Sequence, residues 1–186
     1  MMAVSRKQPN IVITGTPGVG KTTHAELLAT NTQLKHISLN DIAKEEDCYD
    51  GYDEELQTHI LDEDKLLDHI ESGLKAGGNI IDYHACELFP EALIDLVVVI
   101  RCDSTLLFDR MKARRYPERK IEENMDSEIM QVILEEARES YAEEIVVELQ
   151  SDCAEDVERN VERIQSWLEA WKKNNNNSNT TTTTNT

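Results

Sequence analysis

The stretch IVITGTPGVGKTTHAE, residues 11–26, decides the fold class of this chain. It contains Gly15-x-x-x-x-Gly20-Lys21-Thr22 between an apolar, strand-like run and a helical pattern. Glycines let backbone N–H groups turn inward around phosphate oxygens, and the N-terminus of the following helix adds partial positive charge. A chance match in a glycine-rich turn is the alternative, and the strand-loop-helix context argues against it. We interpret the stretch as a P-loop, with Lys21 on the β- and γ-phosphates of a nucleoside triphosphate and Thr22 on Mg²⁺.

The rest of the chain alternates short apolar runs with helical patterns, which predicts an α/β fold of the P-loop NTPase type. Helical spacing is seen around 66–76, 106–114, 120–141 and 157–171. Because LVVVI, residues 96–100, is continuously apolar, we expect a parallel sheet covered by helices on both faces. The five expected strands are Asn10–Thr14, Lys35–Ser38, Asn79–Asp82, Asp95–Arg101 and Glu144–Leu149.

The length and composition favour one domain inside the cell. The 186 residues suffice for one core. The longest purely apolar run, Leu96–Ile100, is far shorter than the roughly 20 residues of a membrane span, so we expect a soluble protein. We expect this domain over residues 1–173. The four cysteines are widely spaced, which favours free thiols over disulfides. Residues 174–186 are only Asn, Ser and Thr, which predicts a disordered tail.

The charge of the chain is strongly acidic, with 37 acidic and 19 basic residues and a formal net charge of −18. Such a domain is repelled by nucleic acid and by anionic membranes. A basic protein is therefore the macromolecular partner that the charge favours.

One cationic segment interrupts this acidic background: RMKARRYPERK, residues 110–120, has six basic residues and a single acid, Glu118. Arg110 and Arg114 are four residues apart and share one face of a predicted helix. Tyr116-Pro117 is expected to end that helix. A hinged, arginine-bearing segment is typical of a lid that neutralises phosphate charge. The alternative is a solvated basic helix end. NKxD and DxxG motifs are absent from the sequence, which argues against a GTP-binding switch protein.

Asp82 and His84 follow the third expected strand, in NIIDYHACE, residues 79–87. Asp82 lies where a Walker-B carboxylate belongs, at the end of the third strand beside the P-loop, and can join Thr22 in the Mg²⁺ shell. His84 can contact or orient a water near the γ-phosphate. The alternative for His84 is a loop histidine without a catalytic role.

Several segments together resemble the adenylate kinase isoenzyme 6 family, a group of nucleoside monophosphate kinase-like proteins. They are NIVITGTPGVGKTT, YDGYDEE, ILDEDKLLD, IIDYH, FPEALIDLVVVIRCD and RMKARRY. The resemblance runs from about Asn10 to Trp171. It implies a five-stranded parallel sheet with the first strand central, a small AMP-binding lobe over residues 38–61 and a short lid over residues 113–123.

The resemblance also implies an activity and a cellular role. We expect a monomeric, broad-specificity adenylate kinase (ATP + AMP = 2 ADP) with intrinsic ATPase activity, located in nucleus and cytoplasm. It implies help in maturation of the small ribosomal subunit and its 18S rRNA, with one basic ribosomal protein as partner. The expected catalytic residues are Lys21, Asp82, His84, Arg110 and Arg114. ATP is expected at Gly15, Pro17, Gly18, Val19, Gly20, Lys21, Thr22, Thr23 and Arg114, and Mg²⁺ at Thr22 and Asp82.

Two positions depart from the family pattern. Arg115 replaces the usual glycine of the lid, and Lys44 is the only Lys or Arg between Lys35 and Lys65, where the lobe usually offers an arginine to AMP. Two hypotheses about the function stay open. The first is a phosphotransferase acting on AMP, and the second is an assembly factor that uses ATP binding and hydrolysis to change its affinity for a protein partner.

Overall fold

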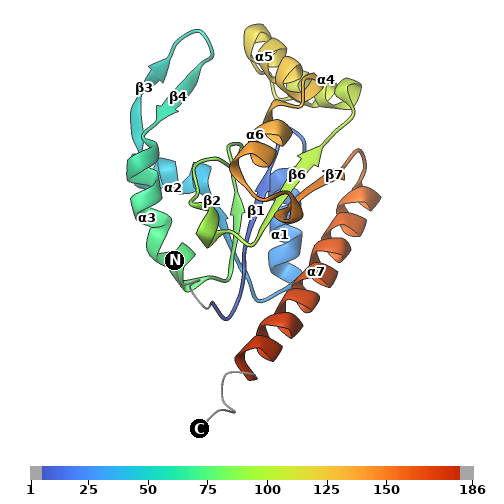
Figure 1. Cartoon of the computed structure of the whole chain (residues 1–186). Helices are drawn as coiled ribbons and strands as arrows, with labels where there is room; N and C mark the ends of the chain where they lie inside the picture. Colours follow the sequence, from blue (N-terminus) through green and yellow to red (C-terminus); the bar gives the residue numbers. More distant parts are fainter. Residues whose placement is uncertain (1–5, 181–186) are drawn as a thin grey trace.

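A five-stranded parallel sheet forms the centre of the molecule (Figure 1). The computed structural model describes residues 6–180, with side chains for residues 6–176. In spatial order the strands are β2 (Lys35–Ser38), β5 (Asn79–Asp82), β1 (Asn10–Thr14), β6 (Leu96–Arg101) and β7 (Val146–Gln150). All residues of β1 are buried. The expected sheet, with the first strand central, is confirmed. The last strand begins later than expected, because Glu143–Ile145 forms a 3₁₀ turn.

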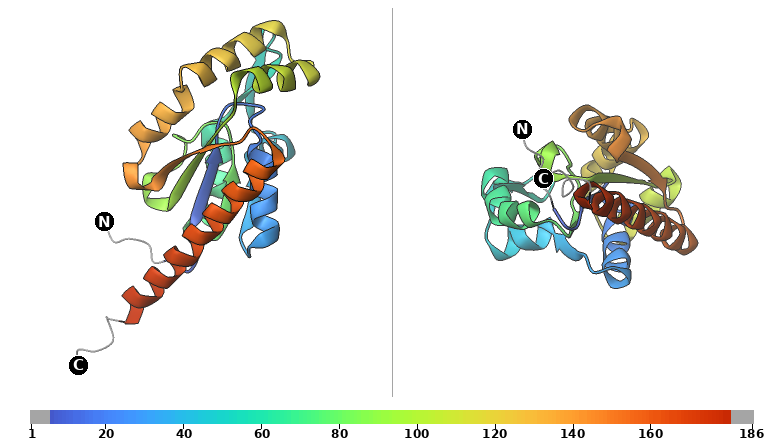
Figure 2. Two further views of the ribbon diagram at one scale, coloured as in Figure 1. Left: turned by 90° about the vertical axis from the view of Figure 1, so that its right-hand side faces the viewer. Right: turned by 60° about the horizontal axis from the view of Figure 1, so that its bottom comes forward.

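Helices cover both faces of the sheet and create two separate cores (Figure 2). Along β1, Val12 packs into one core while Ile11 and Ile13 pack into the other, as the two-residue period of a strand requires. The first core includes residues of α2, α3 and α6, and the second includes residues of α1, α4, α5 and α7. No helix among residues 6–180 is long and apolar enough to cross a membrane. The helices are α1 (Lys21–Asn31), α2 (Leu39–Glu45), α3 (Glu63–Ala76), α4 (Ser104–Ala113), α5 (Glu118–Ile129), α6 (Val132–Ser140) and α7 (Ala154–Thr180).

The polar segment 38–61 contains α2 and an antiparallel hairpin of β3 (Tyr49–Asp53) and β4 (Thr58–Leu61). The hairpin projects from the same end of the molecule as α5, opposite to the C-terminal end of α7 (Figure 1). Tyr52 and Ile60 on the hairpin are half exposed. The hairpin is therefore an outlying lobe and not part of the central sheet.

The predicted single helix over 120–141 is wrong, because the chain breaks it into α5 and α6. Gln131 lies between them in the left-handed conformation, with φ of 59°. The break lets α5 pack in one core through Ile121 while α6 packs in the other through Leu134. Without glycine or proline at the junction, the sequence carries no local signal for this change of direction.

The C-terminal region also differs from the expectation of disorder from Asn174 onward. α7 continues through Thr180, and the Asn175 side-chain amide donates a hydrogen bond to the Arg6 carbonyl at 3.2 Å. A long amphipathic helix can extend into polar residues because each added residue completes one more helical hydrogen bond. The remainder of the expected tail, 181–186, lies outside the described residues.

Candidate active site

The loop between β1 and α1 has the conformation of a phosphate-binding loop. Gly15 has φ of +141°, and a Cβ there would lie 2.4 Å from the Ile100 carbonyl oxygen. Gly18 has φ of +100°, and a Cβ there would lie 3.0 Å from Leu107 Cδ1. Both positions therefore require glycine. The remaining expected loop residues are half-buried Pro17, buried Val19, half-buried Gly20 and exposed Thr23.

Lys21 is folded into this loop. Its ammonium donates hydrogen bonds to the carbonyl oxygens of Gly15 at 2.8 Å and Thr16 at 3.1 Å. Burial lowers the pKa of Lys21 to about 8, and the negative charge of Asp82 opposes that shift. The side chain is thus a desolvated cation at the centre of the loop, which is the place from which it can contact phosphate oxygens.

Thr22 and Asp82 are brought together as the sequence predicted. The Thr22 hydroxyl donates a hydrogen bond to Asp82 Oδ2 at 2.5 Å, and Asp82 is buried at the end of β5. His36 Nε2 lies 3.7 Å from the same carboxylate oxygen. A hydroxyl and a carboxylate are donors that fit Mg²⁺, which usually takes one or two protein oxygens and completes its shell with phosphate and water. Residues 6–176 hold no cluster of three or more His, Cys, Asp or Glu side chains that could hold a metal ion.

His84 lies two residues beyond β5, with its ring centroid 4.3 Å from that of Tyr83. The ring is exposed at the edge of a cleft, yet the atoms crowded around it, together with the positive charge of Lys21, lower the pKa of His84 to about 4. His84 is therefore neutral at neutral pH. It can exchange hydrogen bonds with water or substrate, but it supplies no positive charge.

Arg110 and Arg114 line one cavity of about 400 Å³ beside the P-loop, together with Gly18, Thr23 and Asp152. They differ in what holds them. The Arg110 guanidinium donates to the carbonyls of Asp152 at 3.0 Å and Gly18 at 3.4 Å. Arg114 is exposed at the end of α4, and its charge contributes to the lowered pKa of Lys21. Arg110 is thus part of the cavity wall, while Arg114 is the arginine available to a ligand.

A second cavity of about 410 Å³ lies between the hairpin and the end of β5. Its lining comprises Asn40, Ala43, Tyr49, Thr58, His59, Ile60, Leu61, Glu63, Tyr83 and His84. None of these lining residues is Lys or Arg. The single cation of the lobe, Lys44, is exposed on α2 and is not part of this lining.

The sequence reasoning missed Glu128, a buried carboxylate that joins α5 to the P-loop. It accepts hydrogen bonds from the Thr16 hydroxyl at 2.5 Å, from Arg101 Nε at 2.6 Å and from the Cys102 backbone N–H at 3.3 Å. Glu128 lies seven residues after Ile121 and three after Met125, on the helix face through which those two side chains pack in the core. A charged residue on an apolar stripe was the available signal.

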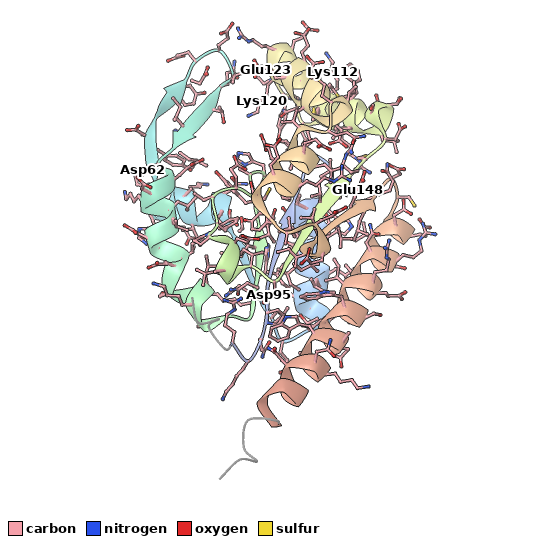
Figure 3. The ribbon with its side chains drawn as sticks, in the orientation of Figure 1. Asp62, Asp95, Lys112, Lys120, Glu123 and Glu148 are labelled. Atoms are coloured by element: carbon pink, nitrogen blue, oxygen red, sulfur yellow. The ribbon has the colours of Figure 1, made fainter. Side chains whose placement is uncertain are left out.

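A second missed residue is Lys120, on the first turns of α5. Its ammonium lies 5.0 Å from the ring centroid of Tyr116, and its charge contributes to the lowered pKa of His84. Figure 3 places Lys120 on the side of α5 that faces the hairpin. Beside it, Arg119 forms an ion pair with Glu55 at the tip of the hairpin. The lid and the lobe therefore touch across the cleft.

The sheet order, the P-loop and the paired Thr22 and Asp82 define a P-loop kinase class. A solved structure of shikimate kinase from Bacteroides thetaiotaomicron supports this fold, with a TM-score of 0.53, 18% identity and coverage of 87% of this chain and 98% of that one. The family model described as an AAA domain matches residues 11–131.

Two curated relatives identify the family more closely. A homologue of adenylate kinase isoenzyme 6 from Dictyostelium discoideum is 50% identical over 175 residues, which cover 94% of this chain and 100% of that protein. A homologue from Schizosaccharomyces pombe is 52% identical over 170 residues, covering 91% and 97%. This chain belongs to the adenylate kinase isoenzyme 6 family, within the AAA-domain P-loop proteins.

Proposed function

We propose that the protein transfers the γ-phosphoryl group of ATP to AMP, giving two ADP. The observation that carries the proposal is the position of Lys21, which is close enough to Asp82 for that carboxylate to raise the pKa of Lys21, and close enough to His84 to lower the pKa of the imidazole. The carboxylate suited to a metal and the histidine of the hairpin cavity thus converge on the P-loop cation. The relatives at about half identity carry the name adenylate kinase, which supports AMP as the acceptor.

ATP is assigned to the P-loop and the adjoining cavity, which we call the donor half. The backbone of residues 15–20 surrounds the phosphates, Lys21 leaves the loop carbonyls for phosphate oxygens, and Arg114 contacts the nucleotide. Arg110 acts through its hydrogen bonds to Gly18 and Asp152, so it positions the cavity walls. Mg²⁺, when held by Thr22 and Asp82, supplies charge neutralisation to the β- and γ-phosphates.

AMP is assigned to the hairpin cavity, which we call the acceptor half together with the lid residues that face it. Because no Lys or Arg lines that cavity, the AMP phosphate needs a cation from outside it. The positive charges of Lys21 and, more weakly, Lys120 both lower the pKa of His84, and Lys21 is already assigned to ATP. We therefore assign the AMP phosphate to Lys120, which lies on the side of α5 that faces the hairpin.

The transfer itself needs positioning and charge neutralisation, and no general base. An oxygen of the AMP phosphate, already ionised at neutral pH, forms the new bond to the γ-phosphorus. The bond from the γ-phosphorus to the oxygen shared with the β-phosphate breaks, and that oxygen leaves with ADP. Lys21 and Arg114 neutralise charge on the transferring group.

We also propose an intrinsic ATPase activity in which water replaces AMP. His84 is neutral and exposed at the cleft, so its ring can accept a hydrogen bond from the attacking water. His84→Ala should therefore lower ATP hydrolysis more than ADP formation from ATP and AMP. His59→Ala, in the same cavity but on the hairpin, is the matched control. Equal losses in both assays for His84→Ala would contradict a role specific to water.

The main test measures ADP formation from ATP alone and from ATP with AMP, CMP, UMP or GMP, using the full chain. Lys21→Met, which removes the P-loop cation, controls for contaminating kinases. We expect AMP to give the largest increase over ATP alone. An increase of the same size with every monophosphate would contradict AMP as the preferred acceptor, and no increase with any would contradict the kinase proposal.

A second candidate function is an ATP-dependent assembly factor for the small ribosomal subunit and its 18S rRNA. The favouring observation is an exposed apolar cluster at the junction of α5 and α6, formed by Ile129, Met130 and Val132 on a protein of net charge −18. An apolar centre in acidic surroundings suits a basic protein partner. The immobilised wild-type protein should retain basic small-subunit ribosomal proteins, and the double variant Ile129→Ser with Met130→Ser should retain less of them. Retention that ATP does not alter would favour the plain kinase.

We further propose that the protein works in both nucleus and cytoplasm. Imaging of a fluorescent fusion, checked by cell fractionation, tests this location. Exclusion from the nucleus would contradict it.

A further inference from the structure

A buried histidine on α1 contacts the P-loop from behind. His24 is fully buried, and its Nδ1 lies 2.8 Å from the Gly20 carbonyl oxygen. Gly20 is the last residue of the P-loop before α1, and it lines the donor cavity. The transfer mechanism does not use His24, since its ring lies in the protein interior and not in the cavity.

Asn160 of α7 fixes the protonation pattern of this histidine. The Asn160 Nδ2 donates to the Gln150 carbonyl at 2.8 Å, which identifies this atom as the amide nitrogen. The same nitrogen lies 3.3 Å from His24 Nε2, so its second hydrogen makes His24 Nε2 the acceptor. The proton of the neutral ring must then be on Nδ1, where it is donated to the Gly20 carbonyl. One directed chain of hydrogen bonds thus links Asn160, His24 and Gly20.

This series of hydrogen bonds connects the two walls of the donor cavity. One wall is the P-loop, including Gly18 and Gly20, and the other is the segment from Ser151 to Val157 that follows β7. Asn160 holds Gln150, the last residue of β7, while His24 holds Gly20. A shift of either wall would stretch a hydrogen bond in the buried interior.

We propose that His24 and Asn160 are positioning residues that set the spacing of the donor cavity, and thereby the affinity for ATP. This inference rests on the proposed use of that cavity by ATP. Burial lowers the pKa of His24 and the Gly20 carbonyl opposes that shift, in keeping with a neutral ring. Because AMP binds elsewhere under the proposed function, its affinity should not depend on the pair.

The first experiment compares binding of a non-hydrolysable ATP analogue with Mg²⁺, and of AMP, by calorimetry on the full chain. Asn160→Leu should weaken binding of the analogue by about fivefold, the equivalent of one net hydrogen bond. His24→Asn keeps an amide donor for the Gly20 carbonyl, so its loss should be smaller than that of His24→Ala. Val161→Ala, a buried neighbour on α7, is the control for general loss of stability. AMP affinity should stay within about twofold of wild type in each variant.

The second experiment reads the tautomer directly, by ¹⁵N NMR of the histidine rings at pH 7. We expect the Nδ1–H form for His24 in the wild type. A predominant Nε2–H form would overturn the inference without any variant. If the wild type binds the analogue and Asn160→Leu binds it with the same affinity, the inference is overturned while the proposed function stands. A wild-type chain that does not bind the analogue would overturn the proposed function and the inference with it.

Discussion

The donor and acceptor halves of the cleft are held in different ways. In the donor half, Lys21 is held by carbonyl oxygens of the P-loop itself, whereas Asp82 and Glu128 are fixed by hydrogen bonds to groups from distant parts of the chain. The acceptor half is a short hairpin with exposed Tyr52 and Ile60 and a cavity without Lys or Arg. A preorganised site can bind its ligand without rearrangement, whereas a sparsely packed one needs another element to complete it. We therefore expect substitutions in the donor half to lower kcat and stability, and those in the acceptor half to act on the KM for AMP.

The largest effect is expected from Asp82→Asn, which removes the carboxylate charge of Asp82 but keeps the shape of the side chain. We expect kcat to fall about 100-fold or more, since charge at the transferring phosphate is the main catalytic contribution in this reaction class. Steady-state kinetics with both substrates measures it, and Asp109→Asn on the exposed face of α4 is the control. A drop of less than about fivefold would contradict the assignment of Asp82 to the metal shell.

The next largest effect is expected on stability, from Glu128→Leu. This change leaves Arg101 without its main partner in the interior, and breaking a buried ion pair costs about 3 kcal/mol or more. Urea unfolding measures it. Glu123→Leu, an exposed residue of the same helix that pairs with Arg119, should cost below about 1 kcal/mol. Similar losses of unfolding free energy in both variants would show that Glu128 contributes no more to stability than an exposed residue of the same helix.

In the donor half, the affinity for ATP should depend on pH through the titration of Lys21. Because the pKa of Lys21 is lowered to about 8, its protonated form predominates at pH 7 and is lost as the pH rises above 8. Phosphate favours the protonated form, so we expect affinity for ATP to fall about tenfold from pH 7 to pH 9. Calorimetry across this range measures it, with Lys21→Met as a control that should show no such slope. An equally steep slope in that variant would assign the titration to another group.

In the acceptor half, Lys120→Ala should raise the KM for AMP about fivefold and leave the KM for ATP within about twofold. The reason is that Lys120 is assigned to the AMP phosphate. Lys112→Ala, a lysine of α4 over the ring of Phe108, is the matched control. A larger rise for ATP than for AMP would reassign Lys120 to the donor half.

The smallest effect is expected at the contact between lid and lobe, the ion pair of Arg119 with Glu55. Both side chains are more than half exposed, so the pair should contribute well below about 1 kcal/mol. A double-mutant cycle of Arg119→Ala and Glu55→Ala, read on the KM for AMP, should show a coupling of about twofold. A coupling of zero at low ionic strength would show that the contact does not affect the acceptor half.

What the sequence predicted depends on how local each feature is, and not on the half of the cleft to which it belongs. The P-loop, the five strands and the Thr22–Asp82 pair were predictable, because each follows from a local motif or from strand ends meeting at one edge of a parallel sheet. The hydrogen bond from Arg110 to the cavity wall could not be predicted, because its acceptor is the carbonyl of Asp152, which is distant in sequence. The break at Gln131 and the burial of Glu128 depend on which core each helix enters, and no single segment encodes that choice.

The helix α5 has a consequence for how the two halves communicate. Glu128 fastens one end of it beneath the P-loop, and Arg119 touches the hairpin near the other end, nine residues or about 13 Å away. A rigid rod pivoting at Glu128 magnifies small angles: a tilt of roughly 5° moves Arg119 by about 1 Å. A tilt of α5 that began at Thr16 would therefore also change the separation of Arg119 and Glu55.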